Sequence, residues 1–272
     1  MPLQISISNA IGSRGVTAAG GFDPDAQAFI TAASITDPTQ QSAINQLVVD
    51  LKGYSIWSKM KALYPFIGGT STTMKWNLKD PRDLDVAFRL VFNGGATFSS
   101  TGYLPNGTNG YADTKLALNT LTRDSNSSGI YIRTNDAGAY TEYGVFDSGT
   151  TGSLQLSVRG TDNNSYVRNG SSSFDTIANT DSRGFYQITR RNSTQIVYSK
   201  NTTKTTISRT ATDVFSNPSF ILIGALNFGS PSFYSIRQYA FAYFGNTSLS
   251  DTELDNMNTA VQAFQTTLGR NV

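Results

Sequence analysis

The sequence predicts a mainly β protein, an antiparallel two-sheet jelly-roll sandwich with a short N-terminal helical extension and a C-terminal helix. From about residue 69 to residue 245, apolar and polar residues alternate with the period of two that half-buried strands require. Gly, Asn and Ser turns separate these runs and no helical segment interrupts them, so neighbouring strands should pair antiparallel. Charged residues make up 15% and aromatic residues 11% of the 272 residues, which favours strands joined by tight turns.

Residues 1–68 are predicted to form a separate N-terminal unit for docking or oligomerisation. It would consist of an extended arm followed by two or three short helices. In the arm, residues 1–21, Leu3, Ile5 and Ile7 alternate with polar residues, which is a strand signal. Such an arm could add a strand to a partner, although a frayed terminus explains the pattern equally well.

Two helix starts follow the arm, because Asp23-Pro24 and Asp37-Pro38 each place a capping acid before a first-turn proline. The second of these helices is expected to end at Gly53. A third helix is predicted to begin at Ser55 and to end before Pro65. Its apolar side would consist of Ile56, Met60, Leu63 and Tyr64.

Residues 69–272 are predicted to form the second unit, the sandwich with its closing helix. About ten strands are expected at the spacing typical of a sandwich. The runs on either side of Arg191-Asn192-Ser193-Thr194 predict a hairpin, and the run Phe220–Gly224 is predicted to be fully buried. The clearest strand signals are residues 84–92, 130–133, 154–158, 185–189, 195–198, 220–224 and 235–244.

The C-terminal helix is predicted from a capping box, Ser250-Asp251-Thr252-Glu253, and from a glycine stop at Gly269. Between them runs an apolar stripe at three-four spacing. The stripe is only two heptads long, which favours packing against the sandwich over a coiled-coil seam. Its members are Leu254, Met257, Val261, Phe264 and Leu268.

Several segments resemble laminin-G-like, concanavalin A-like lectin domains. The run Leu104–Ala112 resembles an early strand of that family, and its Gly107-Thr108-Asn109-Gly110-Tyr111 matches a small Gly-Thr-x-x-Tyr element. The hairpin Phe185–Tyr198 resembles the family's central hairpin. The closing strand Tyr239–Gly245 and the helix after it complete the likeness, which covers roughly residues 72–272. The resemblance implies a concanavalin A-like sandwich, whereas function has to be argued from a site.

Other segments resemble structural proteins of tailed phages that infect Bacteroidetes, namely head-fibre, tail and tail-fibre proteins. They are Tyr64-Pro65-Phe66-Ile67-Gly68-Gly69, Asn77-Leu78-Lys79-Asp80-Pro81 and the tail Val261–Arg270. This resemblance implies a protein made in the host cytoplasm and carried on the surface of the virion. It also implies contacts with other virion proteins and a homo-oligomer, with a trimer favoured.

The composition excludes several functions. The chain has no His and no Cys, which removes the commonest zinc ligands and histidine-dependent catalysis, so no metal site and no catalytic residue is predicted. The net charge is +2 without a dense basic cluster, so nucleic acid is not an expected partner. No signal peptide and no long apolar stretch is visible, so membrane insertion is not expected.

A glycan-processing enzyme is the alternative on this fold, and it needs two carboxyl groups about 5–5.5 Å apart. Asp83 and Asp85 are the best alternate pair, although a loop followed by a polar strand face explains them more simply. The string Asp147-Ser148-Gly149-Thr150 resembles one loop of an aspartic protease, which needs two such loops. A turn between strands is the expected structure there.

Five tyrosines are candidates for stacking on a sugar, because they lie in or next to polar loops. They are Tyr103, Tyr111, Tyr140, Tyr143 and Tyr166. No cofactor is expected, although Asp136 and Asp162-Asn163-Asn164 offer the hard oxygen ligands that a structural calcium would need.

Together these observations favour a non-enzymatic virion protein, a fibre, decoration or tail component that displays a lectin-like sandwich and contacts glycans of the host surface. A glycan-processing enzyme and a free bacterial adhesin are the alternatives. The adhesin should carry an export signal, and the N-terminal residues Met1–Ile5 show none.

Overall fold

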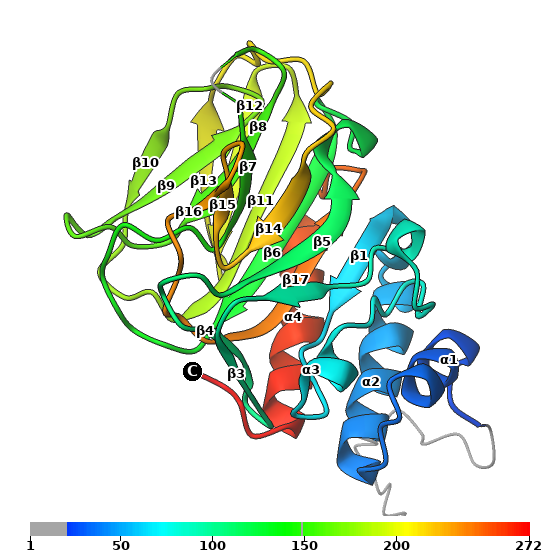
Figure 1. The fold of residues 1–272 in the computed structure, drawn as a ribbon. Coiled ribbons are helices and arrows are strands. Elements are labelled where there is room, and N and C mark those ends of the chain that lie inside the picture. The colour runs from blue at the N-terminus through cyan, green and yellow to red at the C-terminus, as the bar shows by residue number, and fades with distance from the viewer. Residues whose placement is uncertain (1–20, 148) are drawn as a thin grey trace, which may run out of the picture.

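The computed structural model describes residues 21–147 and 149–272 of the chain. The predicted N-terminal arm therefore lies outside the described residues, except for its last position. The described residues form two stacked β-sheets, with a layer of helices against the outer face of one of them (Figure 1). We call the sheet beneath the helices the covered sheet and the other one the open sheet. This arrangement confirms the predicted two-sheet sandwich with a C-terminal helix.

The covered sheet has eight strands in the order β13-β12-β11-β6-β17-β4-β3, with β1 paired to β17. All of its pairs are antiparallel. The predicted hairpin at residue 191 is confirmed as β11 and β12. The strands are β1 (Met60–Tyr64), β3 (Ala96–Ser99), β4 (Gly102–Pro105), β6 (Asn126–Ile132), β11 (Gly184–Asn192), β12 (Gln195–Lys200), β13 (Thr203–Ser208) and β17 (Tyr239–Gly245).

The open sheet has nine strands in the order β10-β9-β8-β7-β14-β5-β2, with the short β15 and β16 attached to β7. Its pairs are antiparallel except that β15 runs parallel to β7. The strands are β2 (Val91–Asn93), β5 (Tyr111–Ala117), β7 (Tyr143–Phe146), β8 (Ser153–Ser157), β9 (Asn164–Asn169), β10 (Asp175–Ala178), β14 (Phe220–Ile223), β15 (Leu226–Asn227) and β16 (Pro231–Ser232).

The helices begin where the capping residues predict. Asp23 accepts a hydrogen bond from the amide of Asp25 at the start of α1, and Asp37 accepts one from Gln40 at the start of α2. Ser250 and Glu253 form the predicted capping box of α4. None of the helices in the described residues has the length and apolar character needed to cross a membrane. They are α1 (Pro24–Ala32), α2 (Pro38–Gly53), α3 (Ser71–Met74) and α4 (Asp251–Thr267), with 3-10 turns at Trp57–Lys59, Asp85–Ala87 and Leu118–Thr120.

The interior between the two sheets is filled by alternate residues of their strands. Leu154 and Leu156 of β8 point inward and are fully buried, whereas Gln155 between them lies on the outer face. They share one apolar cluster with Ile130 of β6 and Ile188 of β11. The inward positions of β9 also include Ser165 and Asn169, which are buried and hydrogen-bonded. The outward positions of the open sheet point away from this interior and can carry other chemistry.

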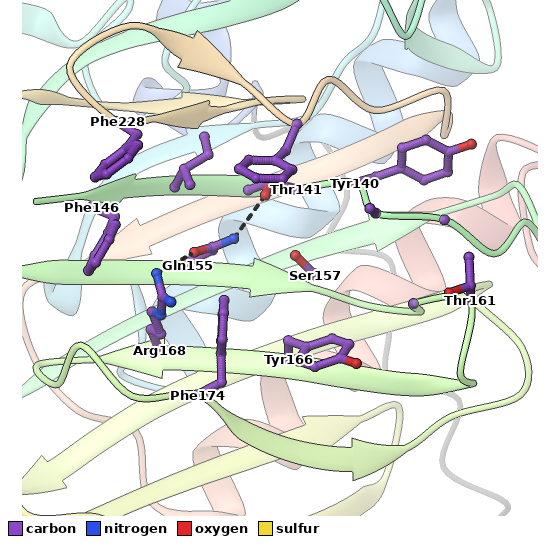
Figure 2. A pocket seen from close by; sticks show the side chains of 15 residues that line it. Tyr140, Thr141, Phe146, Gln155, Ser157, Thr161, Tyr166, Arg168, Phe174 and Phe228 are labelled. Carbon is purple, nitrogen blue, oxygen red and sulfur yellow. Dashed lines mark hydrogen bonds between the residues drawn. The ribbon is translucent and has the colours of Figure 1, made fainter. Parts of the chain in front are cut away.

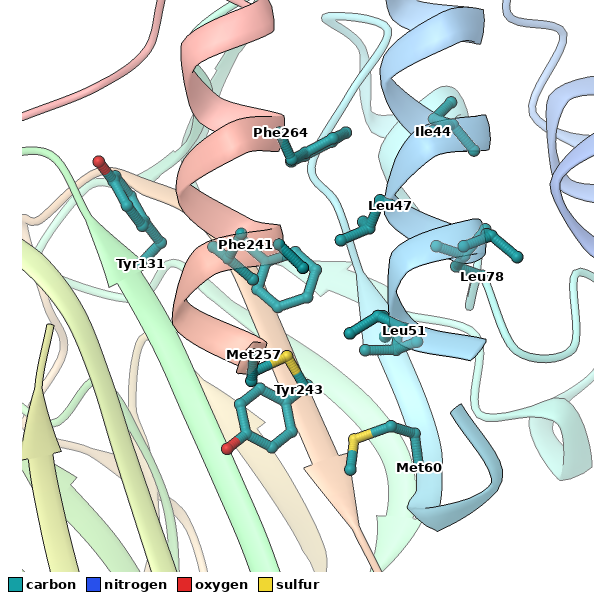
Figure 3. Packing of buried hydrophobic residues seen from close by; sticks show 14 of the residues in the cluster. Ile44, Leu47, Leu51, Met60, Leu78, Tyr131, Phe241, Tyr243, Met257 and Phe264 are labelled. Carbon is teal, nitrogen blue, oxygen red and sulfur yellow. The ribbon is translucent and has the colours of Figure 1, made fainter. Parts of the chain in front are cut away.

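The helix layer closes the outer face of the covered sheet. Phe241 and Tyr243 of β17 point outward and belong to the same apolar cluster as Leu47 of α2 and Met257 and Phe264 of α4 (Figure 3). The rings of Phe241 and Phe264 lie 6.4 Å apart. The stripe of the C-terminal helix is therefore core packing, as predicted. A docking role for residues 1–68 stays a prediction, but the described part of this segment shares a core with the sandwich.

The predicted helix from Ser55 to Tyr64 is wrong. Those residues form a 3-10 turn followed by strand β1, which pairs with β17. Met60 and Leu63 face the helix layer, whereas Ala62 and Tyr64 face the sandwich interior. Because both faces of β1 are buried, the strand shows no alternation of polar and apolar residues, and its apolar spacing imitates a helix.

The predicted strand over residues 84–92 is also largely wrong, because only Val91 and Phe92 of that range belong to a strand. Residues 85–87 form a 3-10 turn, and Phe88 adopts a left-handed backbone with φ of 59°. Tertiary hydrogen bonds hold this conformation, since the carbonyl of Phe88 accepts from the hydroxyl of Tyr64 at 2.6 Å. Val86 is 73% exposed, so the alternation there does not mark a buried face.

Two smaller corrections concern strand ends. The last sandwich strand begins at Tyr239 rather than at Ser235, because Ser235 and Arg237 turn inward to a buried carboxylate. Phe220 was expected to be buried with the rest of β14, but it lies on the outer face and is 37% exposed.

Candidate functional site

The outer face of the open sheet carries a cleft of about 400 Å³, which we call the aromatic cleft (Figure 2). Its floor consists of β7, β8 and β9, and its walls come from the loop before β7, the β8–β9 loop, the β9–β10 connection and the chain around β15 and β16. The lining residues are Gly138, Ala139, Tyr140, Thr141, Phe146, Gln155, Ser157, Gly160, Thr161, Tyr166, Arg168, Phe174, Leu226, Phe228 and Phe233.

Strand register sets the floor of the aromatic cleft. Gln155 of β8 lies opposite Gly144 of β7 on one side and opposite Arg168 of β9 on the other. Ser157 lies opposite Tyr166 in the next outward row. A Cβ at Gly144 would lie 2.9 Å from Cδ1 of Leu226, whose strand lies beside β7, and 3.2 Å from the carbonyl oxygen of Leu154. The glycine therefore leaves room for the side chain of Leu226 at the floor of the cleft.

Five side chains form a continuous stack along the cleft. The ring of Phe228 lies on Phe146 with centroids 5.2 Å apart. The guanidinium carbon of Arg168 lies 4.1 Å from the Phe146 centroid and 3.6 Å from that of Phe174, so the cation is held between two rings. Tyr166 meets Phe174 edge to face at 5.5 Å.

Polar groups accompany the rings. The side-chain amide of Gln155 donates to the hydroxyl of Thr141 at 3.0 Å, and its carbonyl oxygen accepts from Arg168 at 3.3 Å (Figure 2). The hydroxyl of Tyr166 donates to the carboxylate of Asp162 at 2.6 Å. That bond raises the pKa of Tyr166 above its ordinary value.

A buried ion pair outside the cleft lining holds two of its loops together. Glu142 and Arg237 are both fully buried and pair directly. The carboxylate of Glu142 also accepts from the hydroxyl of Tyr239 at 2.8 Å. Arg237 donates to the carbonyls of Asp136 and Arg159 at 2.7 and 2.8 Å, which ties together the loop before β7 and the β8–β9 loop. The guanidinium carbon of Arg237 lies 4.9 Å from the centroid of the Tyr140 ring.

The structure separates the five tyrosines that the sequence singles out. Tyr140 and Tyr166 both line the aromatic cleft and are half-buried. Tyr103 and Tyr143 are fully buried in the sandwich interior, where no sugar can reach a ring face, so the stacking role expected of them is wrong. Tyr111 lies outside the cleft lining and packs against Tyr234 at 6.3 Å.

Sequence reasoning missed most of the cleft. Phe146, Phe174, Phe228 and Phe233 supply its apolar surface, and none of them was a candidate. Phe228 and Phe233 are 47% and 52% exposed, which is unusual for phenylalanine. They flank Gly229-Ser230-Pro231-Ser232, a turn sequence, and two phenylalanines beside such a turn are the signal that could have indicated an exposed aromatic pair.

The acidic residues considered for catalysis lie elsewhere. Asp83 forms salt bridges with Lys75 and Arg89, at 2.5 and 2.7 Å, and Asp85 pairs with Arg89 at 3.0 Å. Both aspartates lie in an exposed loop outside the cleft lining. Asp147 accepts hydrogen bonds from Gly149 and Thr151 in the connection between β7 and β8. That geometry agrees with the expected turn.

The described residues show no cluster of ligands for the calcium ion that the sequence allows. Within residues 21–147 and 149–272, no three His, Cys, Asp or Glu side chains gather as a metal site. The carboxylate of Asp162 accepts from Tyr166 and Asn164, and the side-chain oxygen of Asn163 accepts from Arg159. The calcium site stays a prediction.

No protein-family model and no curated protein sequence matches the chain. Solved structures do share its fold. Domain 4 of AbnA, a GH43 extracellular arabinanase from Geobacillus stearothermophilus in complex with arabinotriose, is 12% identical with a TM-score of 0.52. The match covers 74% of this chain and 98% of that domain.

Two larger proteins match over part of their length. Botulinum neurotoxin type C, whose cell entry depends on interaction with two ganglioside molecules, is 11% identical with a TM-score of 0.56 over 76% of this chain and 52% of that structure. A mutant of Trypanosoma rangeli sialidase displaying trans-sialidase activity is 11% identical with a TM-score of 0.56, over 82% of this chain and 39% of the sialidase. These likenesses support the lectin-like sandwich fold, and function is argued from the cleft.

Proposed function

We propose that the chain is a non-enzymatic, carbohydrate-binding β-sandwich whose aromatic cleft takes a short glycan. The carrying observation is the ring-lined cleft itself, in which Tyr140, Phe228 and Phe233 accompany the amide of Gln155 and the hydroxyl of Ser157. Flat rings stack on the C–H faces of a sugar, and amide and hydroxyl groups bind its hydroxyls. The volume of the aromatic cleft, about 400 Å³, lies in the range of small-ligand pockets.

The position of the cleft supports this proposal. The helix layer covers the outer face of the covered sheet, so within residues 21–147 and 149–272 the outer face of the open sheet is the broad sheet surface left accessible. Two proteins of the same fold have sugar ligands. The arabinanase domain was solved in complex with arabinotriose, and cell entry of botulinum neurotoxin type C depends on interaction with gangliosides. That likeness adds to the proposal and does not replace the argument from the cleft.

Binding without hydrolysis is the version of the proposal that the lining favours. None of the fifteen lining residues is an Asp or a Glu, whereas glycoside cleavage uses two carboxyl groups on either side of the bond. Glu142, a buried carboxylate next in sequence to the lining residue Thr141, is bound to Arg237, Tyr239 and Ser235. A glycan-processing enzyme would need carboxylates from another place on the molecule.

The binding proposal is tested by titrating the protein with a panel of oligosaccharides while following heat or amide chemical shifts. Replacing the exposed Phe228 or Phe233 by Ala should weaken binding by ~2- to 10-fold each, because a stacked aromatic contributes about 0.5–1.5 kcal/mol. Phe220→Ala is the matched control, since Phe220 is an exposed phenylalanine of the same sheet outside the cleft. Equal affinity of all three variants and the parent would refute the cleft as the site.

We further propose that the chain serves as a fibre, decoration or tail component of a bacteriophage particle, as its resemblance to phage structural proteins implies. The sandwich would then present the aromatic cleft to a host surface glycan, and residues 1–68 would contact other virion proteins or sister subunits. Mass spectrometry of purified particles should detect the chain, and sedimentation should show an oligomer, with a trimer favoured. A monomer that is absent from purified particles would refute the virion role and leave the binding proposal standing.

A further inference from the structure

Arg168 differs from the three buried arginines of the described residues in what its guanidinium contacts. Arg237 is paired with Glu142, and Arg270 donates to Gln265 and to three backbone carbonyls. Arg190 donates to the carbonyls of three residues. The guanidinium of Arg168, by contrast, makes one hydrogen bond, to Gln155 at 3.3 Å.

No carboxylate neutralises Arg168 in the part of the chain that the structure describes. No salt bridge within 4 Å includes it, and its Nε is buried without a hydrogen-bond partner. Burial lowers the pKa of Arg168 below its ordinary value, whereas the negative charge of Asp213, which forms no salt bridge with it, acts in the opposite direction. A half-buried cation with unused donors is costly unless a partner supplies the missing acceptors.

The guanidinium is also held in a fixed orientation. Phe146 and Phe174 cover its two faces, and Gln155 lies beside it, itself held by Thr141 (Figure 2). With both faces covered, the edge of the guanidinium carries the remaining N–H donors. A planar, pre-oriented fork of donors matches a carboxylate, because both can form two parallel hydrogen bonds.

We propose that the glycan bound in the aromatic cleft carries a carboxylate, as uronic and sialic acids do, and that Arg168 binds this group. The inference rests on the proposed function and specifies its ligand class. Arg168 would supply the charge-assisted contact, while the exposed rings of Phe228 and Phe233 would pack on the pyranose that bears the acid.

The test compares saccharides that differ only in the acid. Trigalacturonate and 3′-sialyllactose are each titrated beside their own methyl esters, with the same protein at low salt and at 0.5 M NaCl. At least one acid should bind ~10-fold or more tightly than its neutral counterpart, as a charge-assisted hydrogen bond implies. Neutral counterparts that bind as tightly as the acids would overturn the inference and leave sugar binding in the cleft intact. If no saccharide of either class binds, the proposed function fails first.

Variants then locate the contact. Arg168→Met should abolish the preference for the acid, and Arg168→Lys should restore part of it, because lysine keeps the charge without the planar fork. Arg133→Met is the matched control, since Arg133 is a half-buried arginine that follows strand β6 of the covered sheet and makes no salt bridge in the described residues, yet lies outside the lining. An equal loss in both Met variants would indicate a general effect of charge and would overturn the role assigned to Arg168. Thermal unfolding of each variant separates loss of binding from loss of folding.

Discussion

Removing the buried carboxylate of Glu142 should destabilise the whole sandwich. Glu142 and Arg237 are both 0% exposed, and the carboxylate also accepts from Tyr239 and Ser235. Glu142→Ala would leave the charge of Arg237 buried without its partner and would orphan two hydroxyl donors. Breaking a buried ion pair by removing one partner costs about 3–5 kcal/mol. This loss is a large share of a domain's free energy of unfolding, which is about 5–15 kcal/mol.

The assay is equilibrium unfolding in urea of five proteins: the parent, Glu142→Ala, Glu142→Gln, Arg237→Met and the double variant Glu142→Ala/Arg237→Met. Removing both charges together should cost less than the two single losses combined, because the double variant buries no unpaired charge. Glu142→Gln should lie between the parent and Glu142→Ala, since the amide oxygen still accepts from Arg237. A cost below about 1 kcal/mol for Glu142→Ala, or additive effects in the double variant, would refute the buried pair as a coupled unit.

Two further predictions concern the core. Burial raises the pKa of Tyr198 from its ordinary 10.0 to about 12, so the unfolded chain loses this proton first. The protonated phenol of Tyr198 therefore contributes fully to the free energy of unfolding below pH 10. This contribution, up to about 3 kcal/mol, is lost as the pH rises towards 12. Urea unfolding between pH 8 and 11.5 should show stability falling above pH 10, with a shallower slope in Tyr198→Phe; an identical slope would contradict the assignment. Phe264→Ala should cost about 3–5 kcal/mol in a single unfolding transition, because α4 shares its cluster with β17 and α2. A separate early transition would instead mean that the helix layer unfolds independently.

The elements that the sequence predicted correctly are those with strong local signals. The Asp-Pro starts of α1 and α2, the capping box of α4 and the hairpin of β11 and β12 are each specified by residues within a few positions of one another. The two-sheet sandwich followed from alternation repeated along the chain, because a period of two buries one face of each strand. These features need no knowledge of distant contacts.

The errors arose where distant contacts override a local pattern. Met60–Tyr64 has helical spacing, yet it is a strand because β17, about 180 residues later, offers a pairing edge between two buried layers. Phe88 leaves the strand conformation because the hydroxyl of Tyr64 binds its carbonyl. No window of neighbouring residues contains either contact.

The candidate site divides in the same way. The sequence alone determined that the chain folds as a β-sandwich with a polar, aromatic-rich surface, and it singled out Tyr140 and Tyr166, two residues of the cleft. Only the tertiary structure decided that Phe146, Arg168 and Phe174 form one stack and that Tyr103 and Tyr143 are buried instead. The physical reason is that exposure and stacking depend on which strands become neighbours, and that pairing is set by long-range register rather than by the residues on either side.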